Sequence, residues 1–323
     1  MFSPTNLLKF FSYQNLSKII HEIDPDIVHF SDLYPQVHIF AFKIKKYPIV
    51  VTFHGVSPRN IVINTSNLRS FFFSSIISVW NLLSSFSFKM KIDRAIVHTK
   101  IHKEFLIKRG MSEEKIVVIP HGVYNVFKNY NNRRKEEKNT ILFFGNIVWS
   151  KALDILIDAI PLIAAKFPDI KLIIAGDGII PKKCWEIINK YNSNFEIHNY
   201  FIPNEKVCEF FSRASIVVIP NRKQEGHSGS LTVAYSFGKP VVTTNVGEFP
   251  QLVRDTGCGL IVPPNNPEAL AEAIIKLLKN DKLRKKMSIN ALKMAEKLSW
   301  NNIAKMHIKV YEEVLDEWKK KRN

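Results

Sequence analysis

Short apolar runs alternate with longer segments of helical periodicity along most of the chain. Most of these runs are continuously apolar, which is typical of parallel strands covered on both faces. Apolar spacing between them predicts helices such as Lys151–Lys166, Glu205–Ala214 and Pro267–Lys279. Repeated strand–helix alternation predicts an α/β fold with doubly wound parallel sheets. The predicted strands are Asp26–Phe30, Ile49–Phe53, Ala95–Thr99, Ile116–Pro120, Thr140–Gly145, Lys171–Ala175, Phe195–His198, Ser215–Ile219, Val241–Thr244 and Leu260–Val262.

Residues Phe127–Asn139 interrupt this pattern, because they are polar and charged with almost no apolar position. Such a segment is typical of a linker. We therefore expect a first domain over residues 1–130, a linker over 131–139 and a second domain over 140–298. A long surface loop within one domain is the alternative. More predicted strands follow the break than precede it, so we expect a truncated first domain without an opening strand–loop–helix unit.

Two further segments are amphipathic or apolar. Residues 299–323 carry apolar positions at helical spacing and end in Lys319–Arg322, which suits a helix C-terminus. We expect this helix to pack back toward the first domain; contact of its basic end with anionic lipid is the alternative. Ser70–Phe88 has no charged residue but contains seven serines. It reads as a buried or groove-facing helix, an interfacial membrane helix or a membrane span.

Composition limits the class of protein. With 46% hydrophobic and 23% charged residues, the 323-residue chain is neither disordered, collagen-like nor a disulfide scaffold. Three cysteines without a CxxC pair, and no secretory signal at the start, favour a cytoplasmic protein without a zinc module. The formal charge of +17 favours an anionic partner: nucleic acid, acidic lipid or a phosphorylated small molecule.

Three glycine-bearing turns follow predicted strands in the second half, at residues 143–147, 173–178 and 220–230. Ligands of open parallel sheets bind beyond the carboxyl ends of the strands. A glycine-rich helix start lets backbone N–H groups approach a phosphate. None of the turns matches GxGxxG or a P-loop, so a dinucleotide or P-loop site is poorly supported. Together the three turns indicate a phosphate-bearing ligand.

Glu225–Gly247 (EGHSGSLTVAYSFGKPVVTTNVG) resembles the nucleotide-sugar signature of glycosyltransferase family 4, also called group 1. The resemblance implies the GT-B architecture, in which two Rossmann-like domains face an interdomain cleft. It covers nearly the whole chain in the family's order of motifs. The other matching segments are Thr52–Gly55, Pro120–Val123, Phe143–Ala159, Ile173–Gly178 and Phe201–Pro203.

The resemblance implies a retaining, metal-independent transfer of sugar from a nucleotide-diphosphate sugar to a glycan or lipid-linked acceptor, with no cofactor. It places His54, Lys151 and Glu225 at the catalytic centre. Lys151 is expected to contact the donor diphosphate, Glu225 to orient or stabilise the donor sugar, and His54 to hydrogen-bond the donor sugar or the incoming hydroxyl. The expected donor-binding residues are Gly145, Asn146, Gly176, Ile202, Gly226, His227, Ser228, Gly229, Ser230 and Val233.

Each of these assignments has a structural alternative. The alternatives are a solvent-facing lysine at the helix start for Lys151, a carboxylate that offsets the helix dipole for Glu225, and a histidine at the edge of the core for His54. We expect His29, His98 and His121 to be structural. Thr99 either belongs to the site or caps the next helix.

The sequence departs from the family pattern in ways that bear on activity. Val233 stands where a second Glu usually binds the nucleotide ribose. Asn146 and Val148 occupy the places where an Arg usually accompanies the Lys. The usual opening strand and its Gly-rich loop are also missing. A catalytically impaired nucleotide-binding or partner subunit is therefore the alternative function.

We expect the positive charge of the chain to bring the protein to a membrane surface that holds a lipid-linked acceptor. Basic residues of the first domain would meet an anionic surface, which places the protein peripherally at the inner face of the cell membrane. Nucleic acid is not an expected partner, because the basic residues are scattered and form no known motif. The basic residues concerned are Lys43, Lys45, Lys46, Lys89, Lys91 and Arg94.

Overall fold

The structure is a computed structural model that describes residues 16–31, 44, 46–54, 92–130, 133–224 and 227–322. The chain divides into two compact units, one of Met1–Pro120 with Ile303–Asn323 and one of His121–Asn302. The predicted helix Ser70–Phe88 lies outside the described residues, as do the predicted site residues Glu225 and Gly226.

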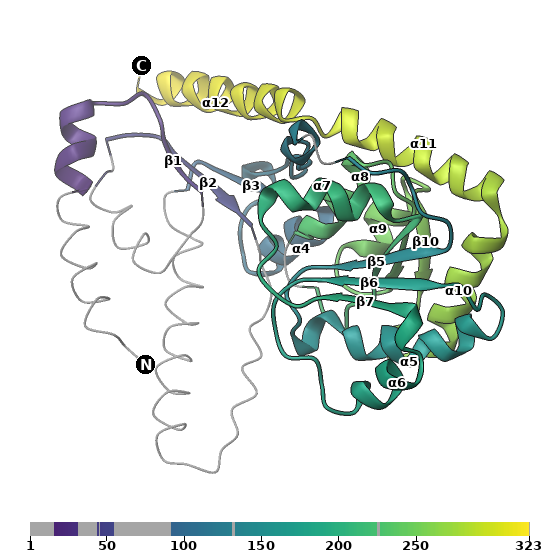
Figure 1. The fold of residues 1–323 in the computed structure, drawn as a ribbon. Helices are drawn as coiled ribbons and strands as arrows, with labels where there is room; N and C mark the ends of the chain where they lie inside the picture. Colours follow the sequence, from purple (N-terminus) through teal and green to yellow (C-terminus); the bar gives the residue numbers. More distant parts are fainter. Residues whose placement is uncertain are drawn as a thin grey trace, which may run out of the picture. The chain divides into compact units, whose positions relative to one another are not determined.

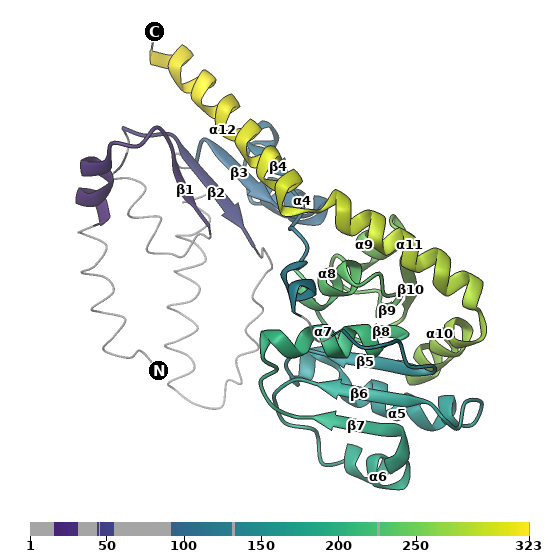
Figure 2. The same ribbon diagram turned by 45° about the horizontal axis from the view of Figure 1, so that its top comes forward.

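The first unit contains a four-stranded parallel sheet in the order β1-β2-β3-β4 (Figure 2). Its strands are β1 (Val28–Phe30), β2 (Ile49–Phe53), β3 (Arg94–Val97) and β4 (Ile116–Val118). Every residue of β2 and β3 is buried, as expected for central strands covered on both faces. The carboxyl ends of the strands therefore lie along one edge of the sheet.

Helices of the first unit come from both ends of the chain. Residues 16–23 are helical, and α4 (Lys100–Lys108) precedes the short 3-10 helix η1 (Glu113–Lys115). The hydroxyl of Thr99 accepts a hydrogen bond from the backbone N–H of His102 at 3.3 Å, so Thr99 caps α4. The last helix, α12 (Trp300–Arg322), contributes Tyr311, whose hydroxyl lies 2.6 Å from Nδ1 of His29. Residues 303–323 thus belong with the first sheet.

Arg94 corrects one prediction. Its side chain is buried, and its guanidinium donates to the carbonyl of Glu114 at 2.9 Å and pairs with the carboxylate of Glu317. Arg94 therefore does not belong to a membrane-facing basic surface. Lys46 is exposed and pairs with Asp24 at 2.7 Å. The other lysines of that predicted surface, Lys43, Lys45, Lys89 and Lys91, lie outside the described residues.

The second unit contains a six-stranded parallel sheet in the order β10-β9-β8-β5-β6-β7 (Figure 2). The chain runs outward from β5 through β6 to β7, then returns to β8 and runs the other way. This reversal makes the carboxyl ends of β5 and β8 the topological switch point, where open α/β sheets bind ligands. The strands are β5 (Thr140–Phe144), β6 (Lys171–Ala175), β7 (Phe195–His198), β8 (Ile216–Ile219), β9 (Val241–Thr244) and β10 (Gly259–Val262).

Helices cover both faces of this sheet. On one face, α5, α6 and α10 pack with the strands into the main apolar core (Figure 1). Asparagine side chains cap α10 and α11: Asn266 accepts from the N–H of Ala269 at 2.8 Å, and Asn280 accepts from the N–H of Leu283 at 2.9 Å. The helices are α5 (Leu153–Ala164), α6 (Cys184–Lys190), α7 (Asn204–Arg213), α8 (Gly229–Ser236), α9 (Phe249–Arg254), α10 (Pro267–Lys279) and α11 (Asp281–Lys297), with 3-10 turns η2 (Val126–Asn129), η3 (Trp149–Lys151) and η4 (Asn192–Asn194).

All ten predicted strands are found, with ends that shift by at most two residues. The helix predicted from Lys151 begins instead at Leu153. Ala152 adopts a left-handed conformation (φ 52°), which separates η3 from α5. None of the helices within the described residues combines the length and apolar character needed to cross a membrane.

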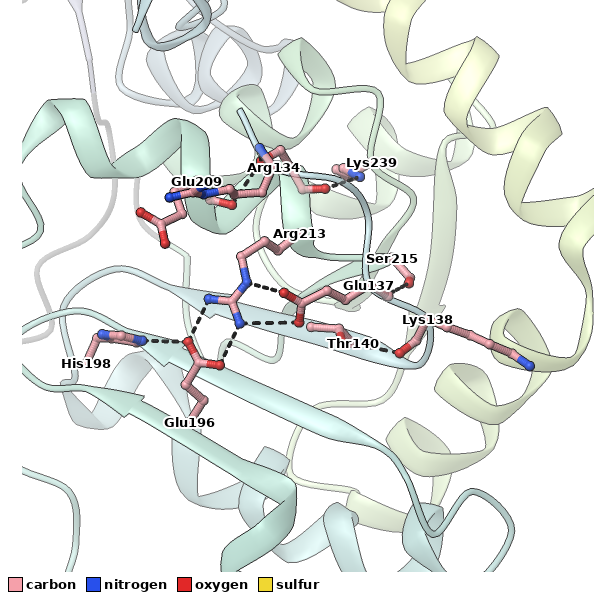
Figure 3. A network of polar contacts seen from close by, with 11 residues as sticks. Arg134, Glu137, Lys138, Thr140, Glu196, His198, Glu209, Arg213, Ser215 and Lys239 are labelled. Carbon is pink, nitrogen blue, oxygen red and sulfur yellow. Dashed lines mark hydrogen bonds and ion pairs between the residues drawn. The ribbon is translucent and has the colours of Figure 1, made fainter. Parts of the chain in front are cut away.

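Residues 133–139, most of the predicted linker, are bound to the second unit. The N–H of Glu137 donates to the carbonyl of Arg213 at 2.8 Å, and Ser215 Oγ donates to the carbonyl of Glu137 at 2.8 Å. Glu136 pairs with Lys239 at 2.6 Å. Figure 3 shows Glu137 also facing the guanidinium of Arg213. The boundary between the units falls earlier, at Pro120.

Candidate functional site

Two glycine turns lie against each other at the carboxyl ends of β5 and β6. The N–H of Gly145 donates to the carbonyl of Ala175 at 3.0 Å. A Cβ atom at Gly176 would stand 1.9 Å from the carbonyl oxygen of Gly145, and Gly176 has φ +157°. Only glycine fits at position 176, because any side chain would collide with backbone. This close contact packs the two turns against each other at the edge of the sheet that contains the switch point.

The loop after β8 is fastened to the turn after β5. Ser230 Oγ donates to the carbonyl of Phe144 at 2.8 Å. The N–H of Arg222 donates to the carbonyl of Ser150 at 2.8 Å. The Lys151 turn and the start of α8 therefore belong to the same edge of the same sheet.

Arg222 was not predicted as a site residue, and it clamps this edge. Its guanidinium makes a bidentate contact with Asp154, with both N–O distances at 2.8 Å, and donates to the carbonyl of Trp149 at 2.9 Å. Burial alone would raise the pKa of Asp154, but hydrogen bonds from Arg222 and Lys183 outweigh it and hold that pKa at about 2. Arg222 is thus neutralised by Asp154 and does not replace the missing second cation.

Unlike Arg222, Lys151 has no counter-charge among the residues that the structure describes. The residue is partly buried in η3, and burial lowers the pKa of its ammonium. Among the described residues, its Nζ has neither a hydrogen bond nor an ion pair. A desolvated cation at a switch point attracts an anionic ligand, because the ligand supplies the interaction that the protein lacks.

The start of α8 contributes backbone N–H donors to the same sheet edge as Lys151. Ser228 is buried, and its hydroxyl caps the helix by accepting from the N–H of Leu231 at 3.4 Å. Because Ser230 Oγ is bound to the carbonyl of Phe144, neither serine hydroxyl is directed at a ligand. What remains is the positive end of the helix dipole at Gly229 and Ser230, which suits a phosphate.

A buried carboxylate that sequence reasoning missed lies beside this helix start. Glu248 is 3% exposed, and neither of its carboxylate oxygens has a hydrogen-bond partner among the described residues. Burial raises its pKa to about 7, and the N–H of Ser228 offsets part of that effect. Glu248 Oε1 lies 3.7 Å from Nδ1 of His227. The ring of His227 stacks on that of His121, with centroids 4.0 Å apart.

The remaining predicted donor residues differ in accessibility. Asn146 is exposed at the end of the β5 turn. Ile202 follows β7 and is 7% exposed, while Val233 is 3% exposed in the middle of α8. The side chain of Val233 is therefore part of the core. The roles of these residues in donor binding stay predictions.

Polar residues of the first unit gather along the carboxyl edge of its own sheet. His54 follows β2 and is exposed, whereas His98 follows β3 and is buried. Nε2 of His98 lies 3.1 Å from Nδ1 of His54, and Nδ1 of His98 lies 3.0 Å from the carbonyl of Ile119. Burial lowers the pKa of the neighbouring His29 to about 4, with further lowering by His307 and His54.

The chain resembles known proteins over nearly its full length. The description "Glycosyl transferases group 1" matches residues 127–294, and "Glycosyltransferase Family 4" matches residues 1–124. An uncharacterized glycosyltransferase of Methanocaldococcus jannaschii is 31% identical over 309 residues, covering 94% of this chain and 80% of the relative. Phosphatidyl-myo-inositol mannosyltransferase of Mycobacterium leprae is 25% identical over 304 residues, covering 90% and 74%.

Solved structures share the fold. A glycosyltransferase of Rickettsia africae has a TM-score of 0.72 at 20% identity, covering 97% of this chain and 83% of that one. Anabaena HepE in complex with UDP has a TM-score of 0.74 at 17% identity, covering 93% and 82%. The likeness extends over both units.

Proposed function

Because the chain belongs to the glycosyl transferases group 1, or family 4, we propose that it is a retaining enzyme that moves a sugar from a nucleotide-diphosphate sugar to a glycan or lipid-linked acceptor. Its fold is GT-B, with a parallel α/β sheet in each unit. The observation that carries the proposal is the partly buried ammonium of Lys151, which has no ion pair among the described residues and lies on the sheet edge where α8 begins.

The reaction explains why such a cation is needed. As the bond between the anomeric carbon and the diphosphate oxygen breaks, negative charge grows on the diphosphate and positive charge on the sugar ring. Lys151 and the backbone donors at Gly229 and Ser230 would stabilise the departing diphosphate. The acceptor oxygen then bonds to the anomeric carbon on the same face, and its proton passes to the diphosphate. Protein groups supply the neutralising charge, so the proposal requires no metal.

Similar proteins support the substrate classes. HepE structures contain UDP, or UDP and glucose, and the mycobacterial relatives are phosphatidyl-myo-inositol mannosyltransferases. For this chain we infer a nucleotide-sugar donor and an acceptor in polysaccharide or glycoconjugate synthesis. A cytoplasmic protein at the membrane surface would meet a lipid-linked acceptor there. Binding to anionic liposomes at low salt tests that placement, and absence of binding would refute it.

The donor site is tested with a panel of UDP-, GDP- and ADP-sugars. We expect one donor to be hydrolysed or transferred, and Lys151→Ala to lower that turnover by about 10²–10³-fold. Lys166→Ala is the matched control, because Lys166 is an exposed lysine that follows the same helix. Turnover that survives unchanged in Lys151→Ala would reject Lys151 as the phosphate-binding cation.

A second candidate is a nucleotide-binding or partner subunit without turnover. Two observations favour it: Val233 is apolar and buried where the family has a ribose-binding Glu, and Arg222 is neutralised by Asp154. Calorimetry would then detect nucleotide binding while long incubations with the donor panel give no product. Clear turnover would eliminate this candidate.

A further inference from the structure

Trp149 presents an aromatic ring to solvent at the carboxyl edge of the second sheet. The residue begins η3, the turn that also contains Lys151, and it is 67% exposed. A tryptophan side chain buries a large apolar area when it packs, so an indole that is left in water forgoes much of that stabilisation. Ligands of open α/β sheets bind at this edge, which makes the exposed ring a candidate for ligand contact.

Arg222 holds one face of the indole. Its guanidinium carbon lies 5.3 Å from the centroid of the Trp149 ring, and the same guanidinium donates to the carbonyl of Trp149 at 2.9 Å. Its Nε donates to Oδ1 of Asn265 at 2.7 Å, and Asp154 binds it through both carboxylate oxygens. The cation beneath the ring is therefore fixed from three sides, and it holds the ring and the main chain of Trp149 together.

The main chain of the turn is fixed as well. The N–H of Lys151 donates to the carbonyl of Val148 at 2.9 Å, and the N–H of Arg222 donates to the carbonyl of Ser150 at 2.8 Å. A ring on such a turn has little freedom left to lose, so a ligand that stacks on it binds at a small cost in conformational entropy.

The second face of the indole has no protein partner within the part of the chain that the structure describes. There, Arg222 is the one cation over the ring, and no other aromatic ring packs on it. Exposed apolar side chains continue beside it. Ile147 pairs with Gly178 on the neighbouring turn, and the residues that follow them, Val148 and Ile179, are 51% and 86% exposed. Exposed apolar patches of this kind mark ligand-binding surfaces.

The chemistry of the family indicates which ligand suits this surface. Glycosyl transferases act on sugars, and C–H groups form the faces of a pyranose ring while its hydroxyl groups point outward into water. These C–H hydrogens are slightly positive, and the face of an aromatic ring carries the negative part of its quadrupole. A pyranose ring can therefore lie flat on the open face of Trp149 and keep its hydroxyl groups hydrated.

We propose that the open face of Trp149 is a stacking platform for a pyranose ring of the acceptor, so that Trp149 contributes to acceptor affinity and not to donor affinity. The assignment to the acceptor rests on the proposed function. Lys151 lies two positions further along the same turn, so a glycan stacked on Trp149 stays close to the diphosphate that Lys151 would bind. An acceptor glycan also extends into solvent, as an exposed ring at the rim of the sheet requires.

The direct test is ¹H–¹⁵N correlation spectroscopy of the ¹⁵N-tryptophan-labelled protein, whose five tryptophans each give an indole N–H signal. The Trp149 signal is assigned by its loss in Trp149→Phe. The probes are the methyl α-glycosides of glucose, galactose, mannose and N-acetylglucosamine, each added alone. We expect at least one of them to shift the Trp149 signal. Trp185 is the matched reporter, because it is 42% exposed on α6 of the same unit, and its signal should stay in place.

Saturation transfer from the protein to the C–H protons of the same sugar measures the stacking itself. Trp149→Leu keeps an apolar side chain but removes the ring, so the transfer should be lost. It should largely persist in Trp149→Phe and in Trp185→Leu. No shift of Trp149 with any sugar, an equal shift of Trp185, or full transfer in Trp149→Leu would each overturn the proposal. The wild-type spectrum decides the matter even where a variant fails to fold, which circular dichroism reveals.

Two further ligands exclude other uses of the ring. Calorimetry with UDP, GDP and ADP should give the same affinities for Trp149→Leu and the wild type. A loss of about 10-fold or more in Trp149→Leu would mean that the ring stacks on the nucleobase, which would overturn the proposal. A Trp149 signal that responds to vesicles of phosphatidylcholine and phosphatidylglycerol and to no sugar would make the ring a membrane contact and would overturn it too.

Kinetics separate this proposal from the proposed function. With the donor found in the panel, Trp149→Leu should raise the acceptor KM by about 10-fold with little change in kcat or in the donor KM. Trp149→Phe should recover most of that loss, and Trp185→Leu should match the wild type. If a sugar shifts Trp149 while no donor is turned over, the proposed function fails and the platform stands. Turnover with an acceptor KM that is unchanged in Trp149→Leu would overturn the platform and leave the proposed function intact.

Discussion

Two polar regions of the second unit differ in whether their charged side chains are paired. Around Arg213 the charged groups are paired by hydrogen bonds: the guanidinium contacts Glu196 at 2.6 and 2.7 Å and Glu137 at 2.6 and 3.2 Å (Figure 3). Hydrogen bonds from Arg213, opposed by burial and helped by His198, lower the pKa of Glu196 to about 2. This region binds residues 133–139 to the sheet and stabilises the fold.

The sheet edge around Lys151 and Glu248 has the opposite arrangement, with buried charged groups that lack hydrogen-bond partners among the described residues. Burial lowers the pKa of Lys151 and raises that of Glu248 to about 7. Lys151 has no ion pair among the described residues, and the carboxylate of Glu248 has no hydrogen-bond partner there, with the His227 ring 3.7 Å away. An unsatisfied buried polar group costs about 1–3 kcal/mol. Such groups persist where a ligand completes them, so the comparison separates a region built for stability from one built for binding.

The largest expected effect comes from breaking the compensated region. Arg213→Met leaves Glu137 and Glu196 facing each other without their shared cation. Removing one partner of a buried ion pair costs about 3–5 kcal/mol, and the Arg213 side chain is 14% exposed. We expect the free energy of unfolding, measured by urea titration at pH 7, to fall by about that amount.

Arg254→Met is the matched control, because Arg254 is exposed on α9. Its unfolding free energy should stay within about 0.5 kcal/mol of the wild type. A loss below 1 kcal/mol in Arg213→Met would mean that the Arg213 network does not stabilise the unit.

The next largest effect that we expect is the contribution of Glu248 to the pH dependence of the free energy of unfolding. Its folded pKa of about 7 lies above the ordinary glutamate value of 4.5, so the folded state binds the proton more tightly. Stability due to this group therefore falls as pH rises from 4.5 to about 7, by up to about 3 kcal/mol at 1.4 kcal/mol per unit. Glu248→Gln should match the wild type near pH 4.5 and exceed it in unfolding free energy at pH 8.

Glu196→Gln provides the opposite sign for the same measurement. The pKa of Glu196 is lowered to about 2, so its contribution is present above pH 4.5 and lost as pH falls toward 2. The variant should be less stable than the wild type at pH 8. A Glu248→Gln variant less stable than the wild type at pH 8 would show that Glu248 has a compensating partner in solution.

The sequence predicted the elements that depend on local pattern. Continuous apolar runs located all ten strands, and glycine turns located the switch-point edge. It also nominated Lys151, which lies on the same sheet edge and whose role in the site stays a prediction. The spacing of apolar residues did not predict that Ala152 would adopt a left-handed conformation at the end of η3.

The missed residues act through partners distant in sequence. Arg222 and Asp154 lie 68 positions apart, and His98 and His54 lie 44 apart. Neither pairing has a periodicity or a motif to reveal it. Glu248 was missed because a carboxylate after a glycine is typical of an exposed turn, whereas the structure buries it at the start of α9. Burial and pairing depend on the folded sheet order.

The smallest expected change in stability belongs to Lys151→Met, and it sharpens the comparison most. The folded pKa of Lys151 is lowered, so its ammonium destabilises the folded state at neutral pH, and the penalty fades only as pH rises above the lowered pKa. Removing the charge should leave the thermal midpoint of the unliganded protein equal to the wild type or slightly higher.

Bound nucleotide should reverse the order of the thermal midpoints, so that the wild type becomes more stable than Lys151→Met. UDP, GDP and ADP are tested in parallel by thermal shift and calorimetry, and the one that binds should stabilise the wild type more than Lys151→Met. Loss of a charge-assisted hydrogen bond predicts affinity weaker by about 1.5–3 kcal/mol, and Lys166→Met should bind as the wild type does. If Lys151→Met were less stable without ligand and equal in affinity, Lys151 would be a structural lysine. The contrast between a compensated region and an open one would then not extend to this residue.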